Sequence, residues 1–192
     1  MNTRKINLTL IIGAMLMSLM IFTSQTSARE NGKIAFASNR DGNDEIYTMN
    51  ANGSNQIQLT NNPTGDGDVE PAFSPDGTKI AFTSHRNGND NTEIYVMNAN
   101  GSNQRRLTNN TGHDYEPAWS PDGMKIAYIR EGDKINVINA DGNEQTTIFQ
   151  GGYFHSLAWS PDGTKIAFAS DDAGVEVINI FVINVAPAWS AG

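Results

Sequence analysis

The chain has 192 residues, no cysteine, 13 basic and 21 acidic side chains, and a formal charge of −8. This length suffices for one domain whose core needs no disulfide bonds. Without cysteine, thiolate catalysis and cysteine-ligated zinc are excluded. Because an acidic chain repels phosphate backbones and anionic lipid, we expect no nucleic-acid partner and no membrane-surface binding through the bulk of the protein.

Residues 1–28 have the pattern of a secretory signal peptide. Arg4 and Lys5 precede an apolar run over residues 6–22, and small residues place a cleavage site after Ala28. An uncleaved anchor is the alternative, because these 17 residues are just long enough to span a bilayer. No cysteine lies near the cut, which excludes a lipid-anchored lipoprotein. Cleavage leaves 11 basic and 21 acidic side chains, with no membrane span, in a periplasmic or secreted protein.

Residues 29–192 consist of repeats. The lysines of "KIAF" or "KIAY" recur at spacings of 46, 46 and 40 residues, which gives repeats of about 32–77, 78–123, 124–163 and 164–192. Four short segments fill each repeat, typified by "PAWS", "KIAFTS", "EIYVMN" and "QRRLT". Their alternating β-branched and aromatic residues, bounded by turn formers, predict strands. Four strands at this spacing predict an all-β fold, a β-propeller of about four four-stranded antiparallel blades.

Recurrent residues within the repeats have structural interpretations. "SPDG" joins the first and second strands, with proline and glycine at positions that suit a tight turn. Its aspartates are expected to accept local backbone N–H groups; they are Asp76, Asp122 and Asp162. One large aromatic slot predicts packing between blades; it holds Phe73, Trp119 and Trp159.

The last repeat is short. "INIFVIN" at 178–184 stands for its third strand, and "PAWS" follows at 187–190, without a fourth strand between them. We therefore expect an incomplete or open propeller in which residues 185–192 are frayed or displaced. Open blade edges also allow self-association, because unpaired strands invite pairing with another chain.

The combination of "PAWSPDG", "KIAF", "EIYVMNANG" and "RRLT" resembles the TolB-like PD40, or WD40-like, β-propeller repeat family. The resemblance implies an exported protein of the cell envelope that binds a protein partner, which for this family is a peptidoglycan-associated lipoprotein. It also implies a ring of six blades, whereas the segments here amount to about four.

Acidic residues mark the start of the first strand in two repeats. We expect Asp68, Glu70, Asp114 and Glu116 to lie at the mouth of the central channel. Carboxylates there could bind Ca²⁺ or a basic peptide, and the alternative is a solvated acidic rim without a cofactor. His85, His113 and His155 occupy non-equivalent repeat positions, which argues against a ring of metal ligands.

No catalytic constellation stands out in the sequence. There is no G-x-S-x-G motif, and no nucleophile and base occur at a fixed spacing. The sequence favours a non-enzymatic exported module that binds a protein, peptide or cell-envelope partner. The alternatives are an accessory or fragment propeller of a peptidase or lyase, and a truncated product of a longer propeller gene.

Overall fold

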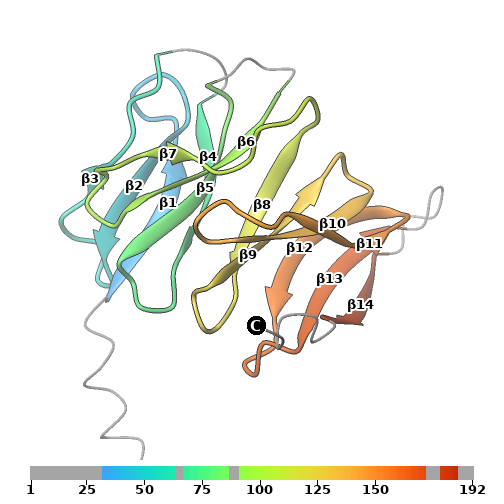
Figure 1. The fold of residues 1–192 in the computed structure, drawn as a ribbon. Helices are drawn as coiled ribbons and strands as arrows, with labels where there is room; N and C mark the ends of the chain where they lie inside the picture. Colours follow the sequence, from blue (N-terminus) through green and yellow to red (C-terminus); the bar gives the residue numbers. More distant parts are fainter. Residues whose placement is uncertain (1–31, 64–66, 87–90, 172–177, 186–192) are drawn as a thin grey trace, which may run out of the picture. The chain divides into compact units, whose positions relative to one another are not determined.

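A computed structural model describes residues 32–63, 67–86, 91–171 and 178–185. The predicted signal peptide and the last "PAWS" segment lie outside these residues. Within the part described, no helix is long and apolar enough to cross a membrane. The described residues form antiparallel sheets that follow one another in chain order, from blue to red in Figure 1.

We number the four sheets as blades. Blade 1 contains β1 (Lys33–Ser38), β2 (Glu45–Asn50) and β3 (Ile57–Gln58). Blade 2 contains β4 (Asp68–Phe73), β5 (Lys79–Ser84), β6 (Glu93–Asn98) and β7 (Arg105–Arg106). Blade 3 contains β8 (Asp114–Trp119), β9 (Lys125–Arg130), β10 (Lys134–Asn139) and β11 (Thr146–Gln150). Blade 4 contains β12 (Tyr153–Trp159), β13 (Lys165–Asp171) and β14 (Ile178–Asn184).

The prediction of an incomplete all-β propeller is confirmed. In the described residues blades 2 and 3 have four strands, and blades 1 and 4 have three. Each complete blade begins with the "PAWS"-type strand. The blades are therefore offset from the repeat ranges counted from "KIAF": blade 2 takes β4 from the range 32–77 and its other strands from 78–123.

Alternating side chains of each second strand serve two neighbouring blades. In β5, Ile80 and Phe82 pack in a cluster with Ile46 of blade 1, whereas Ala81 packs with Trp119 and Tyr128 of blade 3. Successive strand residues point to opposite faces of the sheet, so β5 turns its large side chains toward blade 1 and the small side chain of Ala81 toward blade 3. The core of the protein therefore lies between blades.

The end of blade 4 differs from our expectation. Val185 is buried, and its N–H donates to the Thr164 carbonyl at 2.8 Å. The prediction of fraying is therefore wrong at residue 185, because an apolar side chain there packs with Ala127, Val137 and Ile166. Residues 186–192 of that prediction lie outside the described residues.

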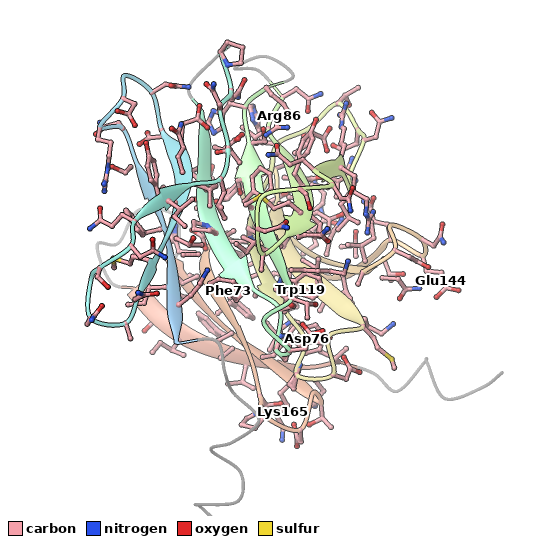
Figure 2. The ribbon with its side chains drawn as sticks, turned by 90° about the vertical axis from the view of Figure 1, so that its left-hand side faces the viewer. Phe73, Asp76, Arg86, Trp119, Glu144 and Lys165 are labelled. Atoms are coloured by element: carbon pink, nitrogen blue, oxygen red, sulfur yellow. The ribbon has the colours of Figure 1, made fainter. Side chains whose placement is uncertain are left out.

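The "SPDG" turns have one geometry in all three copies. The Asp76 carboxylate accepts the Ser74 hydroxyl at 2.5 Å and the Thr78 N–H at 3.0 Å. Asp122 and Asp162 accept the equivalent groups, and the turn glycines have φ between +67° and +72°. The Ser160 hydroxyl and the Thr164 groups lower the pKa of Asp162 to about 2. Figure 2 shows Asp76 toward one end of the blades and Arg86 at the other.

Candidate binding site

A bulge in each first strand positions the acidic residues. The pairing of β4 with β5 shifts between Val69 and Ala72, and β8 and β12 shift at the equivalent place. The bulged residues are Glu70, Glu116 and Ser156, each with φ between +52° and +54°. A residue with positive φ leaves the ladder, and the side chains of Glu70 and Glu116 reach the backbone of the next blade from these bulges.

The two bulge glutamates connect successive blades. One carboxylate oxygen of Glu70 accepts the Thr83 hydroxyl at 2.7 Å and the backbone N–H of Glu116 at 2.8 Å. Glu116 in turn accepts the backbone N–H of Ser156 in blade 4. Burial raises the pKa of Glu116. Glu70 and Glu116 therefore act as ties between first strands.

Two further contacts complete each of these blade boundaries. The residue two positions before each bulge donates its N–H to the preceding blade: Asp114 to the Thr92 carbonyl at 2.9 Å, and Phe154 to the Gly132 carbonyl at 2.8 Å. At the far end of the same strands, Trp119 Nε1 donates to the Ala72 carbonyl and Trp159 Nε1 to the Ala118 carbonyl, both at 3.1 Å. The equivalent Phe73 packs beside the Ile46 and Ile80 cluster. Figure 2 labels Phe73 and Trp119.

The two aspartates are buried inside blades 2 and 3. Asp68 accepts the Ser84 hydroxyl at 2.5 Å and the Arg86 guanidinium at 2.7 Å. Asp114 Oδ2 accepts a hydrogen bond from the Asn110 amide at 2.5 Å. Its other oxygen, Oδ1, lies 3.9 Å from Arg130 Nε. Both side chains are fully buried. Burial raises the pKa of Asp114 to about 6, against the opposing hydrogen bonds from Asn110 and Thr108.

The four predicted acids thus fall into two kinds of position. Two tie blades together and two lie within blades, each already hydrogen-bonded to protein groups. In the described part of the chain no group of three or more histidine, aspartate or glutamate side chains is placed to hold a metal ion. The Ca²⁺ hypothesis therefore gains no ligand cluster from these residues.

A cavity does open at the boundary of blades 2 and 3. It has a volume of about 230 Å³. Its described lining residues are Val69, Glu70, Thr83, His85, Thr92, His113 and Tyr115. His113 Nδ1 lies 3.3 Å from the Thr92 hydroxyl, and burial raises the pKa of Tyr115, so its hydroxyl stays protonated. Imidazole, carboxylate and hydroxyl groups together suit a polar group of a ligand, such as an amide or an ammonium.

The sequence did not predict that two of the histidines share this cavity. His85 follows β5, and His113 precedes β8, so they are unrelated in the repeat. In an antiparallel meander, however, the loop after a second strand and the loop before the next first strand lie at the same end. That connectivity was the signal available in the sequence.

Sequence reasoning also missed two buried glutamates that shape the fourth strands. Glu93 accepts the Thr108 hydroxyl at 2.5 Å, the Asn110 N–H at 3.0 Å and the Arg106 guanidinium. Glu45 binds Thr60 and Asn62 in the same way. The repeated spacing from "EIY" to "LTNN" was the available signal. In blade 3 Lys134 replaces the glutamate, and the fourth strand is five residues long instead of two.

These observations define the class of protein: a β-propeller repeat protein whose blades are tied at their first strands. The PD40 family, the TolB beta propeller domain, matches residues 25–92 and 89–190. The chain therefore belongs to the PD40 family.

Known proteins show how far this likeness extends. The TolB homologue of Chlorobaculum tepidum is 46% identical over 59 residues, which are 31% of this chain and 13% of that protein. The homologue of Chlorobium luteolum is 39% identical over 61 residues, which are 32% of this chain and 14% of its own length. The aligned part of the chain thus spans about a seventh of the curated relatives that it matches.

Solved structures agree on the fold. A putative TolB from Agrobacterium tumefaciens has a TM-score of 0.72 at 23% identity, covering 82% of this chain and 59% of that one. TolB from Acinetobacter baumannii has a TM-score of 0.66 at 26% identity, covering 80% and 38%. A prolyl endopeptidase structure at 16% identity has a TM-score of 0.54, which shows the fold alone.

Proposed function

We propose that the protein is an exported, non-enzymatic propeller module that binds a protein or peptide partner in the cell envelope. The observation that carries the proposal is the polar cavity between blades 2 and 3. Its lining combines Glu70, His85, His113 and Tyr115 with two threonines. Glu70 is already held by two protein donors through one oxygen, which supports a binding role for this carboxylate over one as a general base.

The N-terminal pattern of residues 1–28 and membership of the PD40 family support export to the periplasm in this proposal. An exported binding module would be expected to contact a protein of the same compartment. Fractionation of cells that express the tagged full-length chain tests this step. The proposal requires the chain in the periplasmic fraction or the medium, shortened by the first 28 residues, with residue 29 as its N-terminus. A cytoplasmic, full-length product would overturn it.

Cross-linking in the same cells, followed by affinity capture, tests partner binding. His113→Ala and Tyr115→Phe remove polar groups of the cavity, and both variants should lose a partner that the unchanged chain captures. Met124→Ala is the matched control, because Met124 is exposed and lies in the turn at the opposite end of blade 3. If all four proteins capture the same partners in the same amounts, the cavity is not the binding site.

A further inference from the structure

Blade 2 holds one of its own arginines over two aromatic rings. Phe82 and Tyr95 pair across β5 and β6, with ring centroids 5.8 Å apart. The Arg86 guanidinium lies 5.6 Å from the first ring and 4.5 Å from the second. Its Nε donates to the Ser84 hydroxyl at 2.8 Å. We call this position, between the ring pair and the serine, the arginine slot.

Blade 1 repeats the arginine slot without a first-strand aspartate. Phe36 and Tyr47 pair across β1 and β2, with centroids 5.7 Å apart. Arg40 lies 5.3 Å and 4.6 Å from the two rings, and its Nε donates to Ser38 at 3.0 Å. The described part of blade 1 has no first strand. The Arg40 guanidinium also donates to the Gln56 side chain, as Arg86 does to Gln104. Two rings, one serine and one glutamine therefore hold the guanidinium in blade 1 without a first-strand aspartate.

Blade 4 has the same rings and serine. Phe168 and Phe181 pair across β13 and β14, with centroids 5.6 Å apart and planes at 20°. Ser170 occupies the position of Ser84 and Ser38. Residues 171–184, which follow this serine, include no arginine or lysine. The chain thus builds the slot in blade 4 but encodes no arginine in the segment that supplies one in blades 1 and 2.

A cavity of about 260 Å³ lies at this slot. Its described lining residues are Phe149, Gly151, Gly152, Phe154, Phe168, Ser170 and Phe181. Phe154 replaces the aspartate of blades 2 and 3 and meets Phe168 edge-on at 5.1 Å. Phe149, from β11, lies 5.4 Å from Phe168. Four aromatic rings and one hydroxyl form a cage of the kind that binds cations through ring faces.

Blade 3 shows that this is not a general property of the repeats. Arg130 stands where Ser84 does in blade 2, and Asn136 stands where Tyr95 does. Asn136 donates to the Tyr128 hydroxyl at 3.3 Å. The ring pair is therefore lost in blade 3, and its space is filled by polar contacts within the blade.

We propose that the arginine slot of blade 4 binds an arginine side chain from a partner protein or peptide. The guanidinium lies over the Phe168 and Phe181 pair, its Nε donates to the Ser170 hydroxyl, and Phe149 and Phe154 enclose the remaining edge. The formal charge of −8 favours the approach of a basic segment. This site is separate from the cavity between blades 2 and 3, and it does not depend on the function proposed for that cavity.

Short peptides test the proposal by NMR titration of the full, export-processed chain. The probes are N-acetyl-Gly-X-Gly-amides with arginine, citrulline or leucine as X; citrulline keeps the shape of arginine and removes its charge. Arginine should give saturable shifts at Gly151, Gly152 and Ser170. Citrulline should bind about fivefold more weakly, the factor that ~1 kcal/mol of cation–ring attraction represents. Equal or tighter binding of citrulline or leucine overturns the proposal, as does the absence of shifts with all three.

A ring variant separates binding from folding. Phe181→Leu keeps an apolar side chain at a residue that is 42% exposed. It should weaken binding of the arginine peptide by about fivefold. Val182→Ala is the matched control, because Val182 lies on the same strand, faces the opposite side and is 60% exposed. An equal loss of affinity for the arginine peptide in both variants, or no loss of affinity in Phe181→Leu, contradicts the proposed site.

An internal arginine offers a second test. Arg40 and Arg86 each lie two residues after the slot serine, so Asp172→Arg restores that spacing after Ser170. The variant should compete for its own slot: it should raise the melting temperature and abolish the shifts that the arginine peptide causes. Unchanged peptide binding by a folded Asp172→Arg protein would count against the slot.

Discussion

Blades 2 and 3 share a nearly identical first strand and turn, yet they hold its aspartate differently. Asp68 contacts Arg86 directly at 2.7 Å, whereas Asp114 is 3.9 Å from Arg130. Arg86 can reach Asp68 from beyond the strand because Ser84 is small, but in blade 3 the arginine itself occupies that strand position. The same motif, repeated in two blades of one chain, therefore places its aspartate in two different electrostatic environments. Residues outside the motif set this difference.

The largest difference in stability between blades 2 and 3 should appear when the first residue of the third strand is replaced. Glu93 is fully buried and accepts hydrogen bonds from Arg106, Thr108 and Asn110. Glu93→Ala should lower the free energy of unfolding by about 3 kcal/mol, because it leaves these partners without their acceptor. Lys134→Ala, at the same position of blade 3, should cost less than about 1 kcal/mol, since its ion pair with Asp133 is partly exposed.

Urea denaturation measures both variants. Equal losses would mean that the two blades do not differ at this position.

The second difference between the blades is the pH dependence of stability that Asp114 causes. Because burial raises the pKa of Asp114 to about 6 from 3.8, the folded state binds more protons than the unfolded state between these values. The stability contribution of this group is therefore fully present below pH about 4 and is lost as the pH rises through about 6, by ~3 kcal/mol. Asp114→Asn should remove this slope.

Thermal unfolding of both proteins at intervals between pH 4 and pH 7 provides the comparison. Other carboxyl groups contribute equally to both, so only the difference between the curves is diagnostic. Parallel curves would contradict the assignment.

The aromatic slot gives a smaller contrast. Trp119→Phe makes blade 3 resemble blade 2, where Phe73 occupies this position. The variant loses the hydrogen bond from Nε1 to the Ala72 carbonyl and should cost about 1 kcal/mol. Trp159→Phe should have a similar effect through the Ala118 carbonyl. Chemical denaturation would show whether the two losses match; a loss in only one would mean that the ties are not equivalent.

Calcium should have the smallest effect. The four acidic residues predicted at the channel mouth are already engaged by protein donors, so displacing those donors would offset the gain from coordination. We expect no change in melting temperature with added Ca²⁺, and no heat of binding by calorimetry. A saturable rise in melting temperature would restore the cation hypothesis.

The sequence by itself determined the repeat, the strands and the turns. Each of these depends on local chemistry: side-chain alternation in "KIAF", and the positive φ of a glycine such as Gly77 in the turn. A periodic pattern also requires that neighbouring repeats meet in the same way, so the packing of Trp119 could be anticipated from its recurrence.

Only the tertiary structure decided what the acidic and aromatic residues do. Glu70 and Glu116 became ties because a bulge turns each of them toward the backbone of the next blade, and no local pattern reveals that contact. His85 and His113 share a cavity because loops of two blades lie together. The arginine slot of blade 4 emerged only when Phe168, Phe181 and Ser170 were seen in the register of their counterparts. Sites formed between repeats depend on contacts between distant residues, which repeat spacing alone does not specify.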